Sequence, residues 1–400
     1  MRRLETHIPD LIGRMAAGSD GPVAIAVSGG SDSLALMLLA DVWARRTGRQ
    51  LRVLTVDHGL RREAADEARH VADRAKTLGH HAEILRWTPD RRSQQAARTA
   101  RHKLIARAAQ KAGARLVLFG HTRTDIEETL LMRLSRPSSL TGAVGPQPVS
   151  VSPVWPDGRG VMLGRPLCGE RRDALMAWLR TQRENWTEDP TNESDTYERP
   201  RIRKLTACLD TSRLARITAD AMRLRAVEDA GLAQALRRHV SVHSSGLIQI
   251  DHEPASGRIS RRKLSIVLQL ASGTDRPVAP QSLQTLNREI LDGGPAGRVT
   301  LGGAWVQRRG GHVLIGRDPG EVSRQWCDGV WDGRYIAEAG VTQPAEIPFL
   351  VRHAVPEAKA WREIMSDRLS LWIETLDLGA RLAAELAGAE TMAASTRRRG

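Results

Sequence analysis

Short apolar runs alternate with amphipathic stretches over the first 120 residues of the chain. The apolar runs are rich in β-branched residues, as buried strands are, and lie at Val23–Val27, Val53–Val56, Ala82–Leu85 and Leu116–Phe119. The stretches between them have helical spacing and cover Ser33–Ala44, Arg62–Leu78 and Gln94–Ala112. This alternation predicts an α/β fold, a doubly wound parallel sheet with helices on both faces.

Glycine and polar residues follow three of these predicted strands. Ser28–Ser33 comes after the first strand, Asp57–Gly59 after the second and Gly120–His121 after the fourth. In an open parallel sheet, ligands bind beyond the carboxyl ends of the strands. The sequence therefore predicts a functional site at this edge of the sheet.

The pattern changes after residue 136. The segment 137–160 is rich in Pro, Ser and Gly, which predicts loops and short extended pieces without a helix. Further on, the pattern predicts a strand at Val161–Leu163, helices at Glu170–Thr181, Leu205–Arg238, Arg261–Ala271 and Ser282–Leu291, and a hairpin around a Gly-Gly turn within Arg298–Ile315.

These elements suggest three regions. Residues 1–204 are expected to form the catalytic α/β domain, and residues 205–317 a second, mainly helical domain with a hairpin near its end. Residues 318–400 show weak periodicity, and the sequence assigns them no role.

Composition narrows the function classes. No uninterrupted apolar run approaches the ~20 residues of a membrane span, and the charged opening segment does not resemble a signal peptide, so we expect a cytoplasmic protein without membrane contact. The three cysteines lie far apart, which argues against a disulfide framework or a metal–thiolate site. The formal net charge of +14 favours a polyanionic partner, although genomic bias can also enrich arginine.

The strongest local signal is the segment Ser28-Gly29-Gly30-Ser31-Asp32-Ser33, which connects a predicted strand directly to a helix. Its glycines allow a tight turn in which backbone N–H groups converge at a helix N-terminus, and its serines add hydroxyl donors. Both features suit phosphate groups. The carboxylate of Asp32 beside such a cradle suggests an intervening cation such as Mg²⁺, whereas the alternative is an ordinary helix cap. A Walker-type GxxxxGK[ST] signature is absent from the sequence.

This segment resembles the SGGxDS pyrophosphate loop of the N-type ATP pyrophosphatases (adenine nucleotide alpha hydrolase-like fold), and four further segments resemble the tRNA(Ile)-lysidine synthetase family within that superfamily. In chain order these segments are Thr55–Arg61 (family VDHGLR), Gln95–His102 (QAAAREARY), Gly120–Thr129 (GHHxDDQxET) and Trp186–Asn192 with Arg199–Arg203 (WxEDPSN…RxRIR). The matches cover about residues 20–205, and their order makes the resemblance specific.

The resemblance implies an ATP-dependent reaction on RNA. The family binds ATP and Mg²⁺, adenylates C2 of the wobble cytidine (C34) of tRNA(Ile) with a CAU anticodon, and lets the ε-amine of L-lysine displace AMP, which gives lysidine. The expected partners are thus tRNA(Ile) and L-lysine, and whether the chain forms a homodimer is left open. On this resemblance, residues 1–204 are the PP-loop ATP-binding catalytic domain and residues 205–317 the tRNA-binding domain.

Carried over to this sequence, the resemblance assigns roles to individual residues. Asp32, Asp125 and Arg101 are the expected catalytic residues, with Asp32 also holding the metal. The residues expected to contact ATP and pyrophosphate are Ser28, Gly29, Gly30, Ser31, Asp32, Ser33, Asp57 and His58. Lysine is expected to bind to Asp125 and Glu128, and the nucleotide or cytidine to contact Arg98, Arg101 and His121. The residues expected to contact tRNA are Arg199, Arg201 and Arg203. Asp125 and Glu128 are three positions apart, so on a helix they share a face from which Glu127 points away.

The sequence departs from the family pattern at three places. The paired aspartates of the family become Thr124-Asp125, and the glutamine that follows becomes Ile126. The Gly-rich RGSGxxGL loop is replaced by Arg136–Ala143, which contains proline, and the asparagine before the RIR segment is absent. These departures leave open whether activity is reduced or lost.

Three alternatives accompany this interpretation. A non-catalytic or diverged tRNA-binding PP-loop protein would bind tRNA without consuming ATP. A tRNA 2-thiocytidine synthetase would need grouped cysteines and a lysine at Ser31, neither of which the sequence has. A small-molecule amidating ligase would have no use for the positive charge and the separate helical domain.

Overall fold

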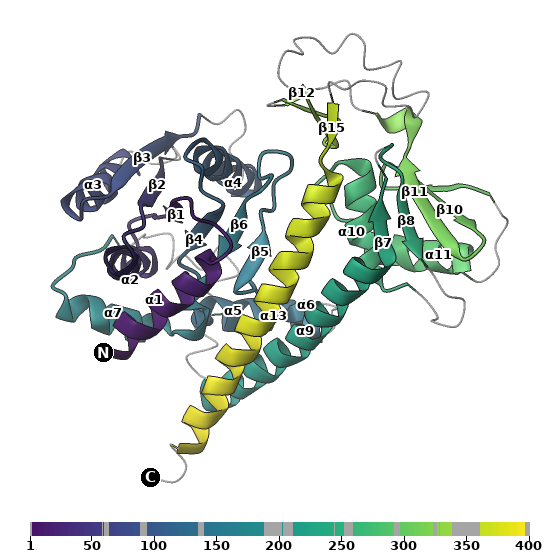
Figure 1. Ribbon diagram of the computed structural model, residues 1–400. Coiled ribbons are helices and arrows are strands. Elements are labelled where there is room, and N and C mark those ends of the chain that lie inside the picture. Colours follow the sequence, from purple (N-terminus) through teal and green to yellow (C-terminus); the bar gives the residue numbers. More distant parts are fainter. Residues whose placement is uncertain are drawn as a thin grey trace. The chain divides into compact units, whose positions relative to one another are not determined.

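The computed structural model of the chain describes residues 2–57, 59, 64–88, 94–134, 140–187, 202, 211–243, 245–251, 259–291, 297–322, 326–327, 329–337 and 361–396. The chain divides into two compact units, each assembled from separate stretches of sequence (Figure 1). Unit 1 comprises Met1–Ser152, Val161–Ala230 and Thr375–Gly400, and unit 2 comprises Pro153–Gly160 and Gly231–Glu374.

Unit 1 is built around a six-stranded sheet with the order β3-β2-β1-β4-β6-β5. Its strands are β1 (Val23–Ala26), β2 (Leu51–Asp57), β3 (His81–Arg86), β4 (Leu116–Phe119), β5 (Val149–Val151) and β6 (Met162–Gly164). Neighbouring strands are parallel except for β5 and β6, which are antiparallel. The order runs outward from β1 in both directions, which confirms the predicted doubly wound sheet and places its switch point between β1 and β4.

The helices of unit 1 follow the predicted pattern except at α6 (Leu140–Ala143), which was not expected. They are α1 (Arg2–Ala16), α2 (Ser31–Thr47), α3 (Ala64–Thr77), α4 (Gln94–Lys111), α5 (Arg123–Leu134), α6 (Leu140–Ala143) and α7 (Arg172–Thr181), with the 3₁₀ helix η1 (Pro166–Gly169). One core cluster joins α4 to the sheet, where Ile105, Ala108 and Ala109 pack with Val117 and Phe119. The small alanines let the helix lie close to the strands.

The Pro/Ser/Gly-rich segment differs from the expectation at one point. We predicted that it contains no helix, and this is wrong at Leu140–Ala143, which form the single helical turn α6. The short extended piece β5 at Val149–Val151 is consistent with the pattern. Residues 135–139, which include the Pro137–Ser139 departure from the family loop, lie outside the described part of the chain.

Unit 2 contains two antiparallel sheets, with the orders β7-β8-β11-β10-β9 and β12-β13-β14-β15. The strands are β7 (Val240–Val242), β8 (Ile248–Asp251), β9 (Val299–Leu301), β10 (Ala304–Arg309), β11 (His312–Arg317), β12 (Trp326–Cys327), β13 (Val330–Trp331), β14 (Tyr335–Ala337) and β15 (Trp361–Glu363). The helices are α10 (Arg261–Ser272), α11 (Pro280–Leu291) and the 3₁₀ helix η4 (Pro319–Glu321), while α9 (Thr211–His239) and α13 (Met365–Thr396) contribute residues to both units.

The predicted hairpin is a three-stranded meander. Gly302 and Gly303 have φ angles of 61° and 79° and form a two-residue turn between β9 and β10, as a type I′ turn requires. A second tight turn at the next Gly-Gly pair, which begins at Gly310 with φ 61°, joins β10 to β11. Both Gly-Gly pairs of the segment therefore reverse the chain.

The interior of unit 2 contains a compact charged cluster around Asp332. Arg317 and Arg334 both donate hydrogen bonds to its carboxylate, at 2.8–3.0 Å. Next to it, Gly273 and Gly333 approach so closely that a Cβ on either would lie 2.0 Å from a backbone oxygen of the other turn. These contacts connect the end of α10 to the turn between β13 and β14, which the sequence did not predict.

The described residues after position 210 are helical where we expected helices, and they include additional short strands. Residues 205–210, at the start of the expected helix Leu205–Arg238, lie outside the described part of the chain. The strands β12 to β15 are only two or three residues long, so no periodicity could reveal them. The boundaries at residues 204 and 317, and the roles attached to them, stay predictions. Within the described residues, no helix is both long enough and apolar enough to cross a bilayer.

Candidate active site at the carboxyl ends of the strands

Three helices of unit 1 begin at the edge of the sheet where β1 and β4 end. Helix α2 begins at Ser31, α5 at Arg123 and α7 at Arg172. Their N-termini approach one another because Arg172 forms ion pairs with carboxylates in the first turns of both α2 and α5. Helix N-termini carry partial positive charge, so this edge suits anionic groups.

The loop between β1 and α2 has the conformation that a phosphate cradle needs. Gly29 has a φ of +88°, which residues with side chains rarely adopt, and Gly30 is the extended N-cap residue of α2 without a side-chain cap. Asp32 is therefore not the helix cap that the alternative interpretation required. The first N–H groups of a helix have no partner within it, so those of α2 are placed to bind an anion.

Two serines of this loop hold its shape. The Ser33 hydroxyl donates to Gly30 O at 2.9 Å and accepts from Ser28 N–H at 3.1 Å. Since its proton is used inside the loop, Ser33 contributes to an anion site by shaping the backbone. The Thr187 N–H donates to Gly29 O at 3.0 Å, which brings the start of the Trp186–Asn192 segment onto the loop.

Gly120, which follows β4, allows the chain to pass close to the first turn of α2. A Cβ on Gly120 would lie 3.1 Å from backbone atoms of Asp32 and Ser33, which is tighter than ordinary packing. The end of β4 therefore lies against the first turn of α2. This close approach places Asp32 near the residues that follow β4.

Arg172 is the centre of an acidic cluster at this edge. Its Nε donates to Asp32 Oδ2 at 2.8 Å, and its Nη2 donates to Asp125 Oδ1 at 3.2 Å. Its Nη1 lies 3.9 Å from Glu128 Oε1, an ion-pair distance without a hydrogen bond. The cluster thus combines three carboxylates with one guanidinium, and the Glu128 side chain is only 1% exposed. The structure brings together Asp32, Asp125 and Glu128, as the predicted roles require.

Asp125 also stabilises the start of α5. Its Oδ2 accepts hydrogen bonds from the Thr122 N–H at 2.8 Å and from the Thr122 hydroxyl at 2.9 Å. Burial raises the pKa of Asp125, but Arg172 and the Thr122 hydrogen bonds outweigh it, so the pKa lies below its ordinary value. Asp125 is therefore a carboxylate, with Oδ1 facing Arg172.

Glu127 belongs to a different set of contacts, as its position on the helix predicted. It accepts hydrogen bonds from Arg123 Nε at 2.9 Å and Arg171 Nη1 at 3.1 Å. Burial raises its pKa despite these two arginines. Glu127 thus stabilises the contact between α5 and α7 and is separate from the acidic cluster.

The two departures from the family pattern in α5 have structural roles. The Thr124 hydroxyl accepts a hydrogen bond from the Arg172 N–H at 3.3 Å and so anchors the start of α7. Ile126 is fully buried in the core. A glutamine at this position would have to place its amide in that core.

A neutral histidine lies at the end of β4. Burial, followed by the nearby Arg165, lowers the pKa of His121 to about 3, so its ring is uncharged at neutral pH. The charges of Arg101 and Arg98 also lower this pKa. Both arginines have exposed side chains on α4, so they are accessible to a ligand at this edge.

Sequence reasoning missed two arginines of this region. Arg165 is buried directly after β6 and donates to Gln147 O at 2.8 Å, so the rule that functional residues follow strands could have found it. Arg172 lies in the first turn of α7, where the helix dipole disfavours a cation. That unfavourable position was the signal that a carboxylate lies nearby.

Four of the predicted site residues lie outside the part of the chain that the structure describes. They are His58, Arg199, Arg201 and Arg203. Asp57 ends β2, and its Oδ1 accepts a hydrogen bond from Gly59 N–H at 3.0 Å, so it shapes the turn after this strand.

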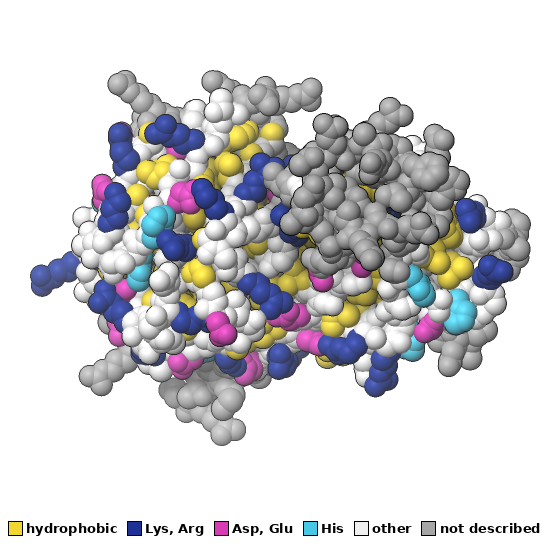
Figure 2. All heavy atoms as spheres, turned by 45° about the horizontal axis from the view of Figure 1, so that its top comes forward, with side chains coloured by type: hydrophobic (Ala, Val, Ile, Leu, Met, Phe, Trp, Pro, Cys, Tyr) yellow, Lys and Arg dark blue, Asp and Glu magenta, His cyan; other side chains and the backbone are white. Residues whose placement is uncertain are grey.

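On the face shown in Figure 2, Lys and Arg side chains are scattered among acidic side chains over the described surface, and they do not gather into one basic patch.

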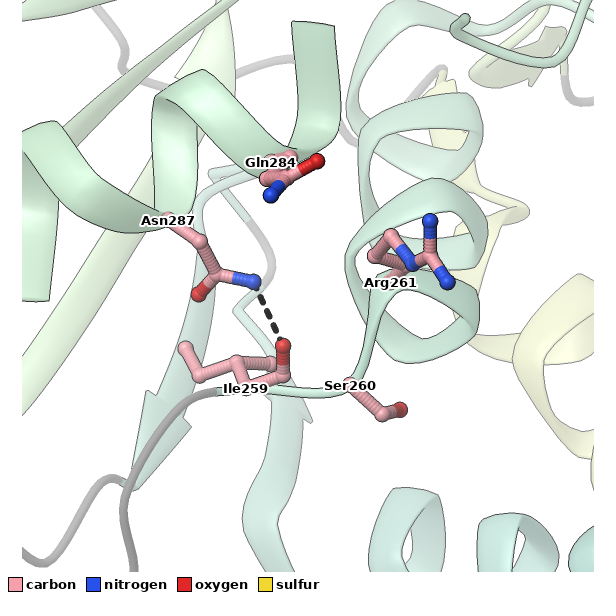
Figure 3. A pocket seen from close by; sticks show the side chains of 5 residues that line it. All are labelled: Ile259, Ser260, Arg261, Gln284 and Asn287. Atoms are coloured by element: carbon pink, nitrogen blue, oxygen red, sulfur yellow. Dashed lines mark hydrogen bonds between the residues drawn. The ribbon is translucent and has the colours of Figure 1, made fainter. Parts of the chain in front are cut away.

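A pocket of about 310 Å³ lies elsewhere, in unit 2, between the start of α10 and helix α11 (Figure 3). It is lined by Ile259, Ser260, Arg261, Gln284 and Asn287, and the Asn287 Nδ2 donates to Ile259 O at 2.7 Å. This lining contains no carboxylate, and its single hydroxyl, that of Ser260, accepts a hydrogen bond from Lys263 N–H as the cap of α10. The acidic cluster is therefore the better candidate for chemistry.

The acidic cluster is suited to hold Mg²⁺ through one carboxylate, with the remaining ligands supplied by water and substrate. Within the described residues, no group of three or more His, Cys, Asp and Glu side chains could hold a metal alone. Mg²⁺ usually takes one or two carboxylates and completes its shell with water and substrate phosphates. Asp32, beside the anion-binding loop, fits this mode, since its carboxylate oxygens are hard donors.

Comparison with known proteins agrees with this geometry. The PP-loop domain family matches residues 3–208. The chain is 40% identical to the tRNA(Ile)-lysidine synthase of Hyphomonas neptunium over 74% of this chain and 81% of that protein, and 35% identical to that of Bradyrhizobium diazoefficiens over 74% and 89%. Among solved structures, the U34-tRNA thiolase NcsA from Methanococcus maripaludis aligns with a TM-score of 0.47 and 16% identity over 56% of this chain and 79% of that chain.

The sheet order, the loop after β1 and the match over residues 3–208 define a PP-loop ATP-binding protein. Within that class, identities above 30% extend over most of this chain and of its relatives. The chain belongs to the tRNA(Ile)-lysidine synthase family.

Proposed function

We propose that this protein ligates lysine to C2 of the wobble cytidine (C34) of tRNA(Ile), with ATP as the energy source. The reaction passes through an adenylated cytidine and yields lysidine, AMP and diphosphate. The observation that carries the proposal is the acidic cluster of Asp32, Asp125 and Glu128 beside the loop at Gly29 and Gly30. The names of the relatives support the same substrates.

In the first step the cytidine oxygen at C2 attacks the α-phosphate of ATP, and diphosphate leaves. The N–H groups of the loop and of the first turn of α2 bind the leaving diphosphate as its charge develops. Mg²⁺, when held by Asp32, would neutralise phosphate charge at this point. In this proposal Arg101 and Arg98 bind the α-phosphate or the base, and the ring of His121, which its lowered pKa keeps neutral, contacts the nucleotide.

In the second step the ε-nitrogen of lysine attacks C2 and AMP leaves. Asp125 and Glu128 bind the ammonium group by charge-assisted hydrogen bonds. The lowered pKa of Asp125 suits it to hold a cation, and a proton must pass from the nitrogen before it attacks. Selectivity for lysine then follows from recognising a positive charge at the end of a long side chain.

The tRNA is the polyanionic partner that the net charge of +14 favours. We propose that it has a CAU anticodon and that Arg199, Arg201 and Arg203 contact its phosphates. The proposed location is the cytoplasm, where ATP, lysine and tRNA are available together. The proposal does not require a dimer.

Incorporation of labelled lysine tests this function. Purified protein is incubated with ATP, Mg²⁺, labelled L-lysine and bulk tRNA, and Asp32→Ala is compared with the unmodified protein. We expect lysine to enter tRNA only with the unmodified protein, together with one AMP for each lysine. Binding of tRNA without incorporation or AMP formation would instead support the non-catalytic alternative.

A further inference from the structure

Arg172 is a partly buried cation to which the proposed reaction assigns no role. Its guanidinium contacts Asp32 and Asp125 by hydrogen bonds and lies within ion-pair distance of Glu128. The three carboxylates of the acidic cluster thus share the guanidinium of Arg172.

Lysine would need the oxygen atoms that Arg172 now holds. Asp125 Oδ2 already accepts two hydrogen bonds from Thr122, so Oδ1 is the oxygen that faces the cluster. Arg172 Nη2 occupies that oxygen, and Arg172 Nη1 lies 3.9 Å from Glu128 Oε1. An ammonium group bound between Asp125 and Glu128 therefore has to replace or share these contacts.

Arg172 can yield these contacts without moving its helix. Its backbone N–H is anchored by the Thr124 hydroxyl at 3.3 Å, so the start of α7 remains fixed. Its side chain is long and 23% exposed, and its Nε and Nη2 both reach Asp32 Oδ2. The guanidinium can thus keep Asp32 while it leaves Asp125 and Glu128.

We propose that Arg172 is a resident counter-cation of the lysine site, which the ε-ammonium of lysine displaces from Asp125 and Glu128. This inference rests on the proposed function, because it takes these two carboxylates as the lysine ligands. In the absence of lysine, Arg172 compensates the cluster and limits its affinity for other cations. Its displacement weakens lysine binding and so makes Arg172 a determinant of lysine affinity.

Equilibrium binding of L-lysine by calorimetry tests this role without measuring turnover. Arg172→Gln is compared with the unmodified protein and with Arg171→Gln, a matched neighbour that contacts Glu127 instead. We expect Arg172→Gln to bind lysine roughly fivefold to tenfold more tightly, since the competing cation is gone, and Arg171→Gln to leave the Kd unchanged. Norleucine, which lacks the ammonium group, should show no gain.

Thermal unfolding gives a second readout on the same proteins. Without ligand, Arg172→Gln should unfold at a lower temperature, and L-lysine should raise its Tm by more than it raises that of the unmodified protein. If Arg172→Gln does not fold, Arg172→Lys tests the proposal instead. Its single ammonium group cannot contact Asp32, Asp125 and Glu128 together, so its Kd for L-lysine should lie below that of the unmodified protein.

The outcomes separate this proposal from the proposed function. Weaker or unchanged lysine binding by Arg172→Gln, or by Arg172→Lys if only that variant folds, would overturn the counter-cation role and make Arg172 a residue that positions the carboxylates. If the unmodified protein bound ATP but no lysine, even with tRNA present, the assignment of Asp125 and Glu128 would fail together with this proposal.

Discussion

Two charged clusters, one in each unit, differ in their ratio of acidic to basic groups. In unit 1, three carboxylates surround the single guanidinium of Arg172. In unit 2, the single carboxylate of Asp332 accepts hydrogen bonds from Arg317 and Arg334 at 2.8–3.0 Å. The Asp332 side chain is 1% exposed, whereas that of Arg172 is 23% exposed.

The difference separates a binding site from a structural one. Around Asp332, both carboxylate oxygens and the Arg317 Nη1, which donates to Gly303 O at 2.7 Å, have partners inside the unit. Around Arg172, three carboxylates lie near one guanidinium, and the Arg172 side chain is partly exposed, so a cation from outside can reach the cluster. A buried cluster whose polar atoms are all paired stabilises the fold, whereas an acidic cluster that a ligand can reach is suited to bind a cation.

The largest expected effect is on the cluster around Asp332. Asp332→Asn leaves two buried guanidinium groups without their carboxylate, so the free energy of unfolding should fall by about 3–5 kcal/mol. Urea unfolding measures this loss. Asp251→Asn, which removes an exposed ion pair with His312, is the control and should change stability by less than about 1 kcal/mol. A similarly small change for Asp332→Asn would mean that the two clusters do not differ as described.

Next in size is a change to the acidic cluster around Arg172. Glu128→Gln should raise the KM for lysine by about tenfold or more, since one of two ammonium ligands loses its charge. ATP-dependent adenylation of tRNA should remain, because it precedes lysine attack. The neighbouring variant Glu127→Gln should lower stability and leave the KM for lysine unchanged, since Glu127 binds Arg123 and Arg171. Equal effects of Glu128→Gln and Glu127→Gln on the KM for lysine would contradict the assignment of Glu128, and not Glu127, as a lysine ligand.

Acid should weaken unit 1 through its buried neutral histidines. Burial, followed by Arg101, lowers the pKa of His102 to about 3, against 6.5 in the unfolded chain. The unfolded state therefore binds the proton first, and stability falls as the pH drops from about 6.5 towards 3, by about 1.4 kcal/mol per pH unit for each such histidine. His102→Gln should reduce this slope in pH-dependent unfolding. An unchanged slope would show that His102 is charged in the folded protein.

The smallest expected effect concerns a neutral polar contact in unit 2. The Ser260 hydroxyl caps α10 by accepting a hydrogen bond from Lys263 N–H at 3.2 Å. Ser260→Ala should lower the free energy of unfolding by about 1 kcal/mol, and Ser260→Asp, which keeps an acceptor, should retain most of it. Thermal unfolding distinguishes these variants. Lysine incorporation per folded molecule should remain the same in both.

Much of unit 1 could be predicted because its signals are local. The runs at β1 and β4, the Gly29–Gly30 turn and the helix start at Ser31 depend on residues within a few positions of one another. Hydrophobic periodicity and glycine conformation report on such short distances. In unit 2, strands of two or three residues carry no such period, which is why β12 to β15 went unpredicted.

The amino-acid sequence by itself determined the alternating strands and helices, the glycine turn after β1 and the carboxylates at Asp32, Asp125 and Glu128. Only the tertiary structure decided that Arg172 lies among them, because it is 140 positions from Asp32 and 47 from Asp125 along the chain. The sheet order places β1 beside β4, and this adjacency brings the first turns of α2 and α5 to one guanidinium at the start of α7. Local patterns determine which elements form, whereas the pairing of charges between elements depends on how the sheet is ordered.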